Sequence, residues 1–577
     1  MLMNRPSSDR NPFPDIHLTL DHQIVLGRPA SHDDLVNELA AFPRNELLVV
    51  LSNLNHLVDG FALVGDPRVQ LPLITNIGGS STLARRIQQA FTVHRGSVFI
   101  FPEQLSSLCK FALLYSRAEK WPEDTNERLL RAMLVYNYLY GKESEADPNA
   151  SEDERLLSLV KLEIGGAPNQ DDRLQNIMVR YEQFFEWARS DTAKISPNYC
   201  DVDTDFQRFA GMTVDEYTTA IFSVLAIMEP APTFENLNPM RSPISLAKVH
   251  SSFTVPAFVR RWIEDHSNNA NDVALEYSRE QPLRYTLASL HGLLKKPLVQ
   301  IDDDHFVAPS RNFLENALGS AIFFTLLDGY NAENQREQAK RFTRFFGEFF
   351  EQYGLAIARA FGARSKSLCF GELLYRDDKS TDIVLFEGER AVFIEVVSKR
   401  FNLLASVVSR DPASIQNDLE DMIIDKAVQL ERCVKDFRSE KLIFDGVQQR
   451  RIRKIYPVVL VVQPMSMSYG VRILINKLLK QKNLLQTTCP LEVMEIGTFE
   501  SLEPALGRGI KLSTFLNAKM KHKVGCRVSV KNYIFHYLPE LHETMARQRD
   551  RSLLAYRHAA WFKRACDLVK TWGIRED

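Results

Sequence analysis

The sequence predicts an α/β domain in the C-terminal part of the chain, with a mixed sheet flanked by helices, and a large, mainly α-helical N-terminal region before it. Two observations predict this. From about residue 335 onward, helical patterns and short apolar runs follow the order helix, strand, strand, strand, helix, strand. Between about 104 and 334, the apolar residues mostly recur at three- and four-residue spacing, which indicates helices.

The chain has 577 residues, enough for several domains. We expect a mixed α/β segment over 1–110, a mainly helical region over 111–334, and an α/β domain with a basic extension over 335–577. The seven cysteines are scattered singly, without a CxxC pair, which favours reduced thiols and a cytoplasmic protein. The apolar runs are too short to cross a bilayer, so no membrane partner is expected.

The first segment contains two apolar runs, 46–54 and 96–101, that are typical of strands. Between them, the glycines and serines of 78–81 precede a helical pattern. A helix N-terminus of this kind can hold an anion. The stretch lacks the Gly-Lys-Ser/Thr ending of a phosphate-binding loop, so it predicts an ordinary capped helix.

The C-terminal domain begins with a predicted amphipathic helix over 341–361. Its aromatic residues share one stripe, while Glu348 and Glu351 lie on another side. A second long helix is expected over 414–437, where apolar residues again recur in helical register. A buried strand should follow at 455–463.

Residues 380–401, STDIVLFEGERAVFIEVVSKRF, predict a tight β-hairpin with Gly388 first in its two-residue turn. That register places Asp382 opposite Glu395, with Cβ atoms about 5 Å apart. Facing acids are destabilising, and a shared divalent cation such as Mg²⁺ or Mn²⁺ would resolve the conflict. The alternative is a register shifted by one or two residues, in which each acid lies beside an arginine.

This arrangement resembles the PD-(D/E)XK nuclease superfamily, which has a restriction-endonuclease-like fold. The matching residues, within about 335–437, are Glu348 or Glu351 in GEFFEQY, Asp382 in STDIVLF and Glu395 in VFIEVVSKRF. The resemblance implies a Mg²⁺- or Mn²⁺-dependent phosphodiesterase acting on DNA or RNA. It further implies that Asp382 and Glu395 are metal ligands and that the helix acid is an auxiliary ligand or base.

The chain departs from the superfamily at Val397, where a lysine is expected. Lys399 should share a strand face with Glu395 by alternation, and is therefore the candidate for the displaced catalytic lysine. Lys426 and Gln429, on the following helix, are further candidates to reach the site. The superfamily also includes inactive binding modules without the lysine. Three hypotheses therefore stand: an active nuclease, an inactive nucleic-acid-binding or scaffolding module, and an unrelated α/β domain.

The net charge is −2, but from residue 441 onward the chain carries about +13, which favours a polyanionic partner at that end. The residues predicted to contact phosphates are Arg450, Arg451, Arg453 and Lys454, with a second cluster of Lys519, Lys521, Lys523 and Arg527. The alternative is that these residues only solvate the surface. The helical N-terminal half would recognise a protein partner or target, and a homo-oligomer is compatible with this organisation. A nuclease joined to a large sensing half is similar to bacterial antiviral defence proteins.

Overall fold

The computed structural model describes residues 19–541, except 60–66, 95–96, 145–150, 152–153, 158–159, 161–173, 228–243, 246–256, 281–289, 291, 294–295, 376–377, 403–405, 407–410, 463–468, 507–509 and 539. Residues 542–577, the end of the expected basic extension, therefore lie outside the described residues. Two compact units divide the chain. Unit 1 comprises Met1–Ile16, Pro148–Cys200 and Arg336–Phe562, and unit 2 comprises His17–Asp147, Asp201–Gln335 and Lys563–Asp577. Because each unit draws on separate stretches of sequence, this division differs from the three consecutive segments expected.

Unit 2 is mainly helical, as expected for most of its length. Its helices are α1 (His22–Leu26), α2 (His32–Ala40), α3 (Arg44–Asp59), α4 (Pro67–Gly78), α5 (Thr82–Val93), α6 (Pro102–Tyr115), α7 (Thr125–Ser144), α11 (Val202–Ala210), α12 (Val214–Ile227), α14 (Ala257–Asp265), α15 (Ala270–Glu280), α17 (Arg311–Ala317) and α18 (Ser320–Ala332). A small sheet of order β1-β4-β3-β2 is formed by β1 (Ile244–Ser245), β2 (Ser267–Asn269), β3 (Leu298–Gln300) and β4 (His305–Val307).

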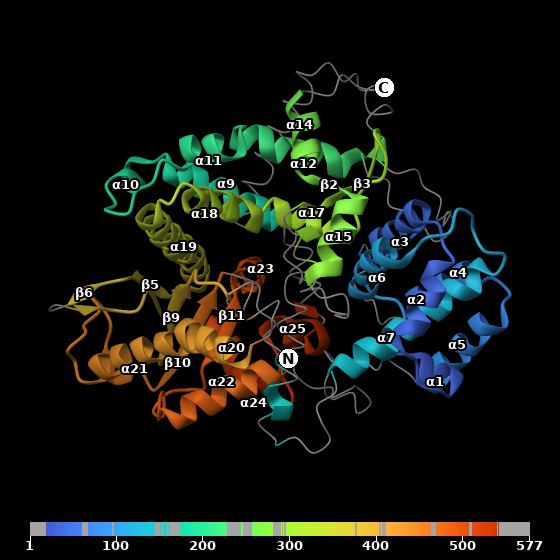
Figure 1. Ribbon diagram of the computed structural model, residues 1–577. Helices are drawn as coiled ribbons and strands as arrows, with labels where there is room; N and C mark the ends of the chain where they lie inside the picture. The colour runs from blue at the N-terminus through green and yellow to red at the C-terminus, as the bar shows by residue number, and fades with distance from the viewer. Residues whose placement is uncertain are drawn as a thin grey trace. The chain divides into compact units, whose positions relative to one another are not determined.

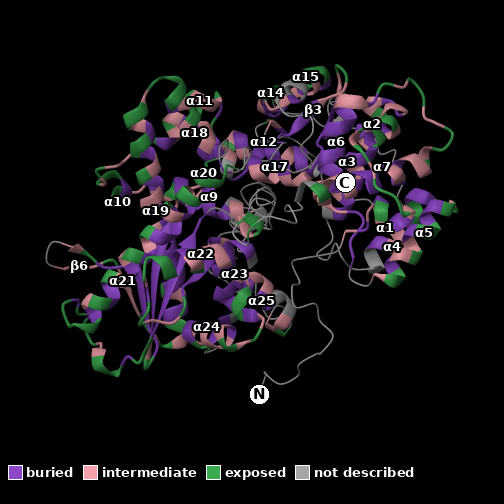
Figure 2. Ribbon diagram, turned by 60° about the horizontal axis from the view of Figure 1, so that its bottom comes forward, coloured by how far each residue is buried: buried purple, intermediate pink, exposed green. Residues whose placement is uncertain are grey.

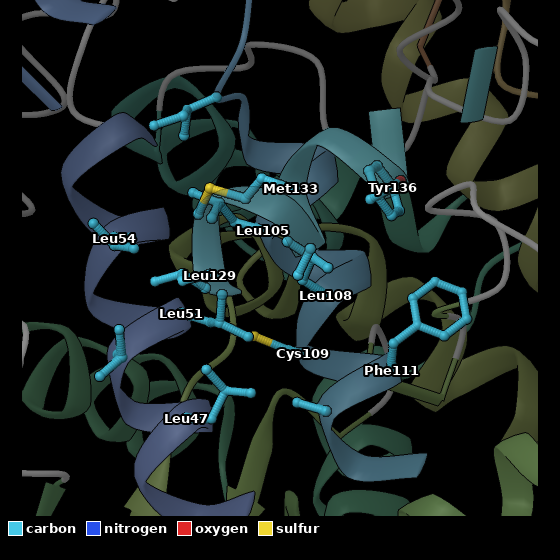
Figure 3. Close-up of a cluster of buried hydrophobic side chains, with 14 of the residues drawn as sticks. Leu47, Leu51, Leu54, Leu105, Leu108, Cys109, Phe111, Leu129, Met133 and Tyr136 are labelled. Atoms are coloured by element: carbon cyan, nitrogen blue, oxygen red, sulfur yellow. The ribbon is translucent and has the colours of Figure 1, made fainter. Parts of the chain in front are cut away.

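The strands predicted in the first segment are wrong. The run 46–54 lies inside the 16-residue helix α3, and the run around 96–101 contributes only an isolated bridge between Val98 and Thr19. A short apolar run fits a buried helix as well as a strand, and tertiary packing decides: α3 packs against α6 and buries its leucines in a shared apolar cluster (Figure 3). The predicted helix cap is confirmed, since Ser81 accepts a hydrogen bond from the Ala84 N–H at the start of α5.

Unit 1 is an α/β unit built around a five-stranded sheet. Its strands are β5 (Leu368–Gly371), β8 (Ile383–Phe386), β9 (Arg390–Val397), β10 (Lys454–Val461) and β11 (Glu492–Glu495), with a separate pair, β6 (Leu374–Tyr375) and β7 (Asp378–Lys379). Its helices are α9 (Leu174–Ala188), α10 (Asp191–Lys194), α19 (Arg336–Ser365), α20 (Pro412–Leu419), the π-helical turn η5 (Glu420–Ile424), α21 (Asp425–Arg438), η6 (Gln449–Arg451), α22 (Tyr469–Gln481), α23 (Ile496–Leu506), α24 (Leu512–Lys521), η7 (Gly525–Arg527) and α25 (Val530–Tyr537).

The large sheet is mixed, as predicted. Its order is β11-β10-β9-β8-β5; β5, β8 and β9 are antiparallel, whereas β9, β10 and β11 are parallel. Strands β8, β9, β10 and β11 are almost entirely buried (Figure 2), whereas the edge strand β5 is partly exposed. In Figure 1, α19 runs along one side of the strands and α20 and α21 along the other. The sheet therefore has two apolar faces, and a charged side chain is tolerated only near its ends.

The two faces of the sheet pack against helices in different ways. On one face, α19 comes close to the strands because residue 354 is a glycine: a Cβ there would lie 3.3 Å from Ile383 and 3.5 Å from Leu460. On the other face, Phe437 of α21 packs against Phe386 and Phe393, with ring centroids 5.6 Å apart in both pairs. Helices α19 and α21 are thereby held against the β8–β9 hairpin, beside Asp382 and Glu395.

The turn end of the β8–β9 hairpin is tied to α24. Gly388 has a φ of 77°, and the Glu387 N–H donates to the Arg390 carbonyl over 2.8 Å, as the predicted turn requires. The buried Glu387 carboxylate accepts from the backbone N–H groups of Leu512 and Ser513, at 3.1 and 2.7 Å. These N–H groups belong to the first turn of α24, which lacks a side-chain cap of its own, so Glu387 serves as its distant cap.

None of the helices within the described part of the chain combines the length and the apolar character that crossing a bilayer requires.

We predict that Glu387→Ala lowers the free energy of unfolding of unit 1 by about 2–3 kcal/mol, because two helix N–H groups lose a charged acceptor. Urea unfolding followed by circular dichroism measures this. The matched control is Glu389→Ala, two residues away, whose side chain is 60% exposed and pairs with Arg453. That control should change the free energy by less than about 0.5 kcal/mol; equal effects of the two substitutions would contradict the capping role.

Candidate functional site

Asp382 and Glu395 lie near one end of the β8–β9 hairpin. The structure pairs Ile383 with Ile394 and Val384 with Phe393, in the predicted register. Asp382 directly precedes β8 and interacts electrostatically with Glu395. Both acids are nearly covered, with exposed fractions of 8% and 3%. The Val396 N–H donates to Asp382 Oδ2 over 2.7 Å, which fixes that carboxylate.

Two further acids join this pair. Gly371 pairs with Ile383, so the next residue, Glu372, continues the row on the far side of Asp382 and interacts with it electrostatically. Glu351 approaches from α19 and interacts with Asp382 and Glu372. Four carboxylates therefore lie at one end of the sheet, which we call the acid row: Glu351, Glu372, Asp382 and Glu395.

Burial and mutual repulsion both oppose ionisation in the acid row. Burial raises the pKa of Glu351 to about 8 and that of Glu395 to about 7, and the charge of Asp382 adds to both shifts. Burial also raises the pKa of Asp382. A raised pKa means that the ionised form is disfavoured in the fold, so the acid row lowers the stability of the metal-free protein.

Lys426 is the cation that the structure brings to the acid row. Its Nζ lies 2.9 Å from Glu395 Oε2 and donates to Gln429 Oε1 over 2.9 Å. Burial disfavours its charge, but the attraction of Glu395 and Asp382 outweighs burial and raises the pKa of Lys426. Lys426 and Gln429, predicted as auxiliary residues, therefore both reach the site.

A π-helical turn sets the rotation of the helix that carries Lys426. In η5 the Asp425 N–H bonds to the Glu420 carbonyl, five residues earlier. One extra residue in a turn rotates everything after it by about 100° relative to an uninterrupted α-helix. The predicted single helix 414–437 is thus confirmed in extent, but it consists of α20, η5 and α21. Such turns are frequent at functional sites.

The expectation that Lys399 lies on the same strand face as Glu395 is wrong. Strand β9 ends at Val397, so the alternation that should have aligned Lys399 with Glu395 does not extend to it. The half-exposed Lys399 Nζ instead pairs with Asp421 in η5. Val397, at the position where the resemblance predicts a lysine, is buried and pairs with Val461 of β10.

The two helix acids have different surroundings. The Glu348 carboxylate accepts from the Ser196 hydroxyl and the Asn198 side-chain amide, both over 2.6 Å. It therefore joins α19 to the segment after α10. Glu351 is the helix acid that interacts with Asp382, although both were candidates from the sequence.

The predicted basic clusters lie away from the acid row. Lys454 pairs with Arg390 at the turn end of β9, whereas Glu395 pairs with Val459; five residues of strand separate the two levels by about 16 Å. The side chains of this cluster also have local partners: Arg450 pairs with Glu440, Arg453 with Glu389, and Lys454 donates to Asn517. Arg451 is exposed.

The expectation for Lys519 is contradicted by its burial. Its side chain is fully buried, with Nζ 2.9 Å from Glu492, which also pairs with Arg472. A lysine in this position neutralises an internal carboxylate and is inaccessible to a phosphate. Lys521, Lys523 and Arg527 are exposed, as that prediction requires.

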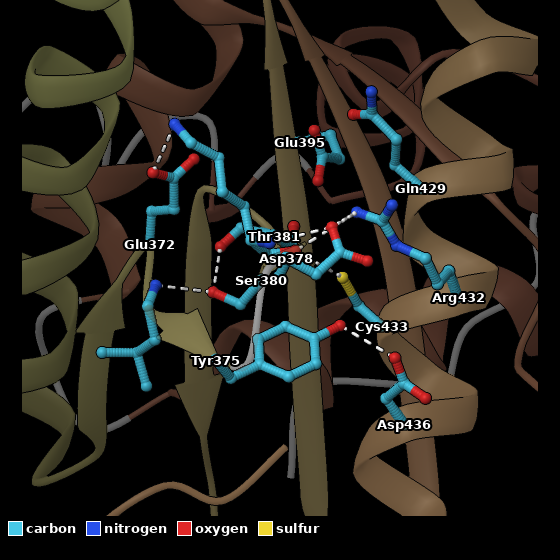
Figure 4. A network of polar contacts seen from close by, with 12 residues as sticks. Glu372, Tyr375, Asp378, Ser380, Thr381, Glu395, Gln429, Arg432, Cys433 and Asp436 are labelled. Carbon is cyan, nitrogen blue, oxygen red and sulfur yellow. Dashed lines mark hydrogen bonds and ion pairs between the residues drawn. The ribbon is translucent and has the colours of Figure 1, made fainter. Parts of the chain in front are cut away.

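Sequence reasoning missed the residues around the β6–β7 hairpin (Figure 4). The buried Thr381 hydroxyl donates to the Ile394 carbonyl over 2.6 Å, which joins β8 to β9 beside Glu395. Arg432 of α21 pairs with Asp378 at 3.0 Å, and Lys379 pairs with Glu372 at 2.9 Å. The one available signal was the charged stretch 376–379 immediately before Asp382, which composition alone assigns to a turn.

Asp382 and Glu395 fit a two-carboxylate site for a hard divalent cation, since they are adjacent, buried and incompletely neutralised. Among the described residues, no group of three or more His, Cys, Asp and Glu side chains is arranged to hold a metal ion. Any such site would therefore need backbone or water oxygens in addition, which Mg²⁺ accepts readily. A scan against known family models, a search of curated proteins and a search of solved structures each find no match.

We predict that Asp382→Asn stabilises the metal-free protein by about 1–3 kcal/mol at pH 8, because it removes one buried charge while an oxygen remains to accept from Val396. The folded-state pKa of Asp382 is raised. Ionised Asp382 therefore lowers the stability of the fold above its ordinary pKa of about 4. The stability gained by Asp382→Asn should vanish as the pH falls below that value. Urea unfolding in EDTA at pH 8 and at pH 4 measures the difference.

The opposite substitution provides the control. Lys426→Met leaves Glu395 buried without its ion-pair partner and should destabilise the protein at pH 8. If Asp382→Asn and Lys426→Met shift the unfolding midpoint in the same direction, the electrostatic account of the acid row is wrong.

Proposed function

We propose that unit 1 is a divalent-metal-dependent phosphodiesterase that acts on DNA or RNA. The observation that carries the proposal is the Lys426–Glu395 contact of 2.9 Å. This contact brings an ammonium group to the acids Asp382 and Glu395. Strand β9 does not supply that charge itself, because it has Val397 where the resemblance predicts a lysine. The site then contains the three groups that phosphodiester hydrolysis of this type uses: two metal-binding carboxylates and a cation.

The charge balance of the acid row supports a divalent cation. When all four are ionised, as above the raised pKa values of Glu351 and Glu395, Glu351, Glu372, Asp382 and Glu395 carry four negative charges. Lys426 and Lys379, the lysines that interact with them, offset two. The remainder of about −2 matches one Mg²⁺ or Mn²⁺.

Asp382 and Glu395 would hold the metal ion. When bound, such an ion lowers the pKa of a coordinated water and stabilises negative charge on a phosphate oxygen. The Val396 N–H, bonded to Asp382 Oδ2, keeps one ligand oriented. The Lys426 ammonium can stabilise charge that develops on the reacting phosphate, and Gln429 holds that ammonium in place. Glu351, which interacts with Asp382 electrostatically, would act as the base.

The order of elements also supports the proposal. Helix α19, strands β5, β8 and β9, helix α21 and strand β10 follow the helix-strand-strand-strand-helix-strand order that the sequence predicts. This order and the mixed sheet are compatible with a restriction-endonuclease-like fold. The basic residues at the turn end of the sheet, Arg451 among them, are candidates for additional nucleic-acid contacts about 16 Å away.

The second candidate function is a nucleic-acid-binding or scaffolding module that has lost catalysis. The observation that favours it is Val397, which is buried in the apolar sheet where the resemblance would place the lysine. In that case the acids would serve only to position the hairpin and α21.

We predict Mg²⁺- or Mn²⁺-dependent cleavage by the purified full-length protein of at least one of four labelled probes: single- and double-stranded DNA and RNA. Asp382→Asn should abolish cleavage, because the metal loses a ligand. Lys426→Met should lower the rate by about 10²–10³-fold, the usual effect of removing one charge-stabilising donor. Gel electrophoresis of the products measures both effects.

Lys399→Ala is the matched control for Lys426→Met, because Lys399 lies in the same unit but pairs with Asp421. It should retain cleavage within a few-fold of wild type. Equal cleavage by wild type and Asp382→Asn would reveal a contaminating nuclease and refute the proposal. Metal-independent binding of the probes without cleavage would support the second candidate.

We also predict that Mn²⁺ binds to the wild-type protein with about one ion per chain and that Asp382→Ala removes this binding. The reason is that a single carboxylate beside Lys426 no longer attracts a divalent cation. Isothermal titration calorimetry measures the stoichiometry. Glu348→Ala is the control, since Glu348 is hydrogen-bonded to Ser196 and Asn198, and it should bind Mn²⁺ as wild type does.

A further inference from the structure

The β6–β7 hairpin interrupts the core sheet beside the acid row. It is inserted between β5 and β8: Glu372 leads into it, and three residues after it ends at Lys379 the chain reaches Asp382. The Leu373 N–H donates to the Ser380 hydroxyl and the Ser380 N–H to the Leu373 carbonyl, each over 2.8 Å. The base of the hairpin is therefore closed next to the site.

Helix α21 anchors the hairpin through both of its strands. The Arg432 guanidinium pairs with Asp378 at 3.0 Å and donates to the Lys379 carbonyl over 3.2 Å. From β6, the Tyr375 hydroxyl donates to Asp436 over 2.9 Å (Figure 4). Since α21 also carries Lys426, the helix that places the cation at Glu395 also sets the position of the Lys379 backbone.

The Lys379 side chain is accessible and faces the acid row. It is 63% exposed and lies 2.9 Å from Glu372, which is 33% exposed. The Lys379 ammonium also interacts electrostatically with Glu351 and Asp382. An exposed ion pair contributes little to stability, so Lys379 can exchange Glu372 for another anion at small cost.

Lys426 has a different part in the proposed function, at the reacting phosphate. Its side chain is only 25% exposed and is bonded to Glu395 and Gln429, so it is less available than Lys379 to the rest of the nucleic-acid backbone. A nucleic-acid phosphate that approaches four carboxylates is repelled unless an accessible cation lies beside them. Lys379 meets this requirement.

We propose that Lys379 is a phosphate-binding residue, which contacts the backbone of the nucleic acid that unit 1 engages, and that the β6–β7 hairpin exists to present it. This inference deepens the proposed function and rests on its assignment of a nucleic-acid substrate. The contact recognises the phosphate charge and not the base, so it should act on all sequences alike.

The test is fluorescence anisotropy with fluorescein-labelled single- and double-stranded DNA and RNA, using full-length protein in an Asp382→Asn background that blocks cleavage. Lys379→Ala should weaken binding about five- to tenfold for every sequence. It should also reduce the slope of log affinity against log salt by about 0.9 for duplex DNA or about 0.7 for single strands. Glu372→Gln should strengthen binding, because it removes the competing anion.

Lys340→Ala is the matched control: Lys340 is 65% exposed and pairs with Glu337 at 2.8 Å, but it lies at the start of α19. It should leave affinity and slope unchanged, and thermal unfolding should show that all variants are folded. Unchanged affinity and slope in Lys379→Ala, or the absence of binding to any probe, would overturn the inference. Failure of cleavage in the wild type would count against the proposed catalysis alone, since the binding contact is measured without it.

Discussion

Unit 1 depends on the compensation of carboxylates buried at one end of an otherwise apolar sheet. Water solvates an ionised carboxylate far better than a protein interior does, so Asp382 and Glu395 need partners within the fold. The Val396 N–H serves Asp382, and the Lys426 ammonium serves Glu395. This compensation is incomplete, because the pKa values of both acids remain raised. A divalent cation between them would relieve the remaining repulsion, which connects the stability of the fold with the proposed chemistry.

Helix α21 joins the apolar core to this polar site. Toward its C-terminal end, Phe437 packs on Phe386 and Phe393 and closes one face of the sheet. Toward its N-terminal end, Lys426 meets Glu395. The packing of Phe437 and the contact of Lys426 with Glu395 both depend on how α21 is rotated about its axis, and the π-helical turn η5 sets that rotation. A change in η5 would therefore disturb the site and the core together.

Other buried carboxylates of unit 1 follow the same principle with different partners. Glu387 accepts from the first turn of α24, and Glu492 lies between Arg472 and Lys519. Part of the positive charge of the C-terminal region is thus neutralised by carboxylates inside the fold. Net charge along the sequence consequently overstates the basic surface that a nucleic acid could meet.

The sequence by itself predicted the hairpin register that β8 and β9 adopt, with a shifted register as the alternative, and the mixed sheet between helices. These features follow from local signals: alternation with period two, helical periodicity, and a glycine where a tight turn needs a positive φ. Local signals wrongly predicted a strand for the run 46–54, which is a helix packed against α6 in the tertiary structure.

The tertiary structure alone decided which charged residues share a site. It selected Lys426 over Lys399, because β9 ends before Lys399 while η5 turns Lys426 inward. It selected Glu351 over Glu348, and it brought Lys379 beside the acid row. These choices depend on where strands end, how helices are rotated and which distant segments meet. Because such contacts join residues far apart in the chain, no spacing rule along the sequence contains them.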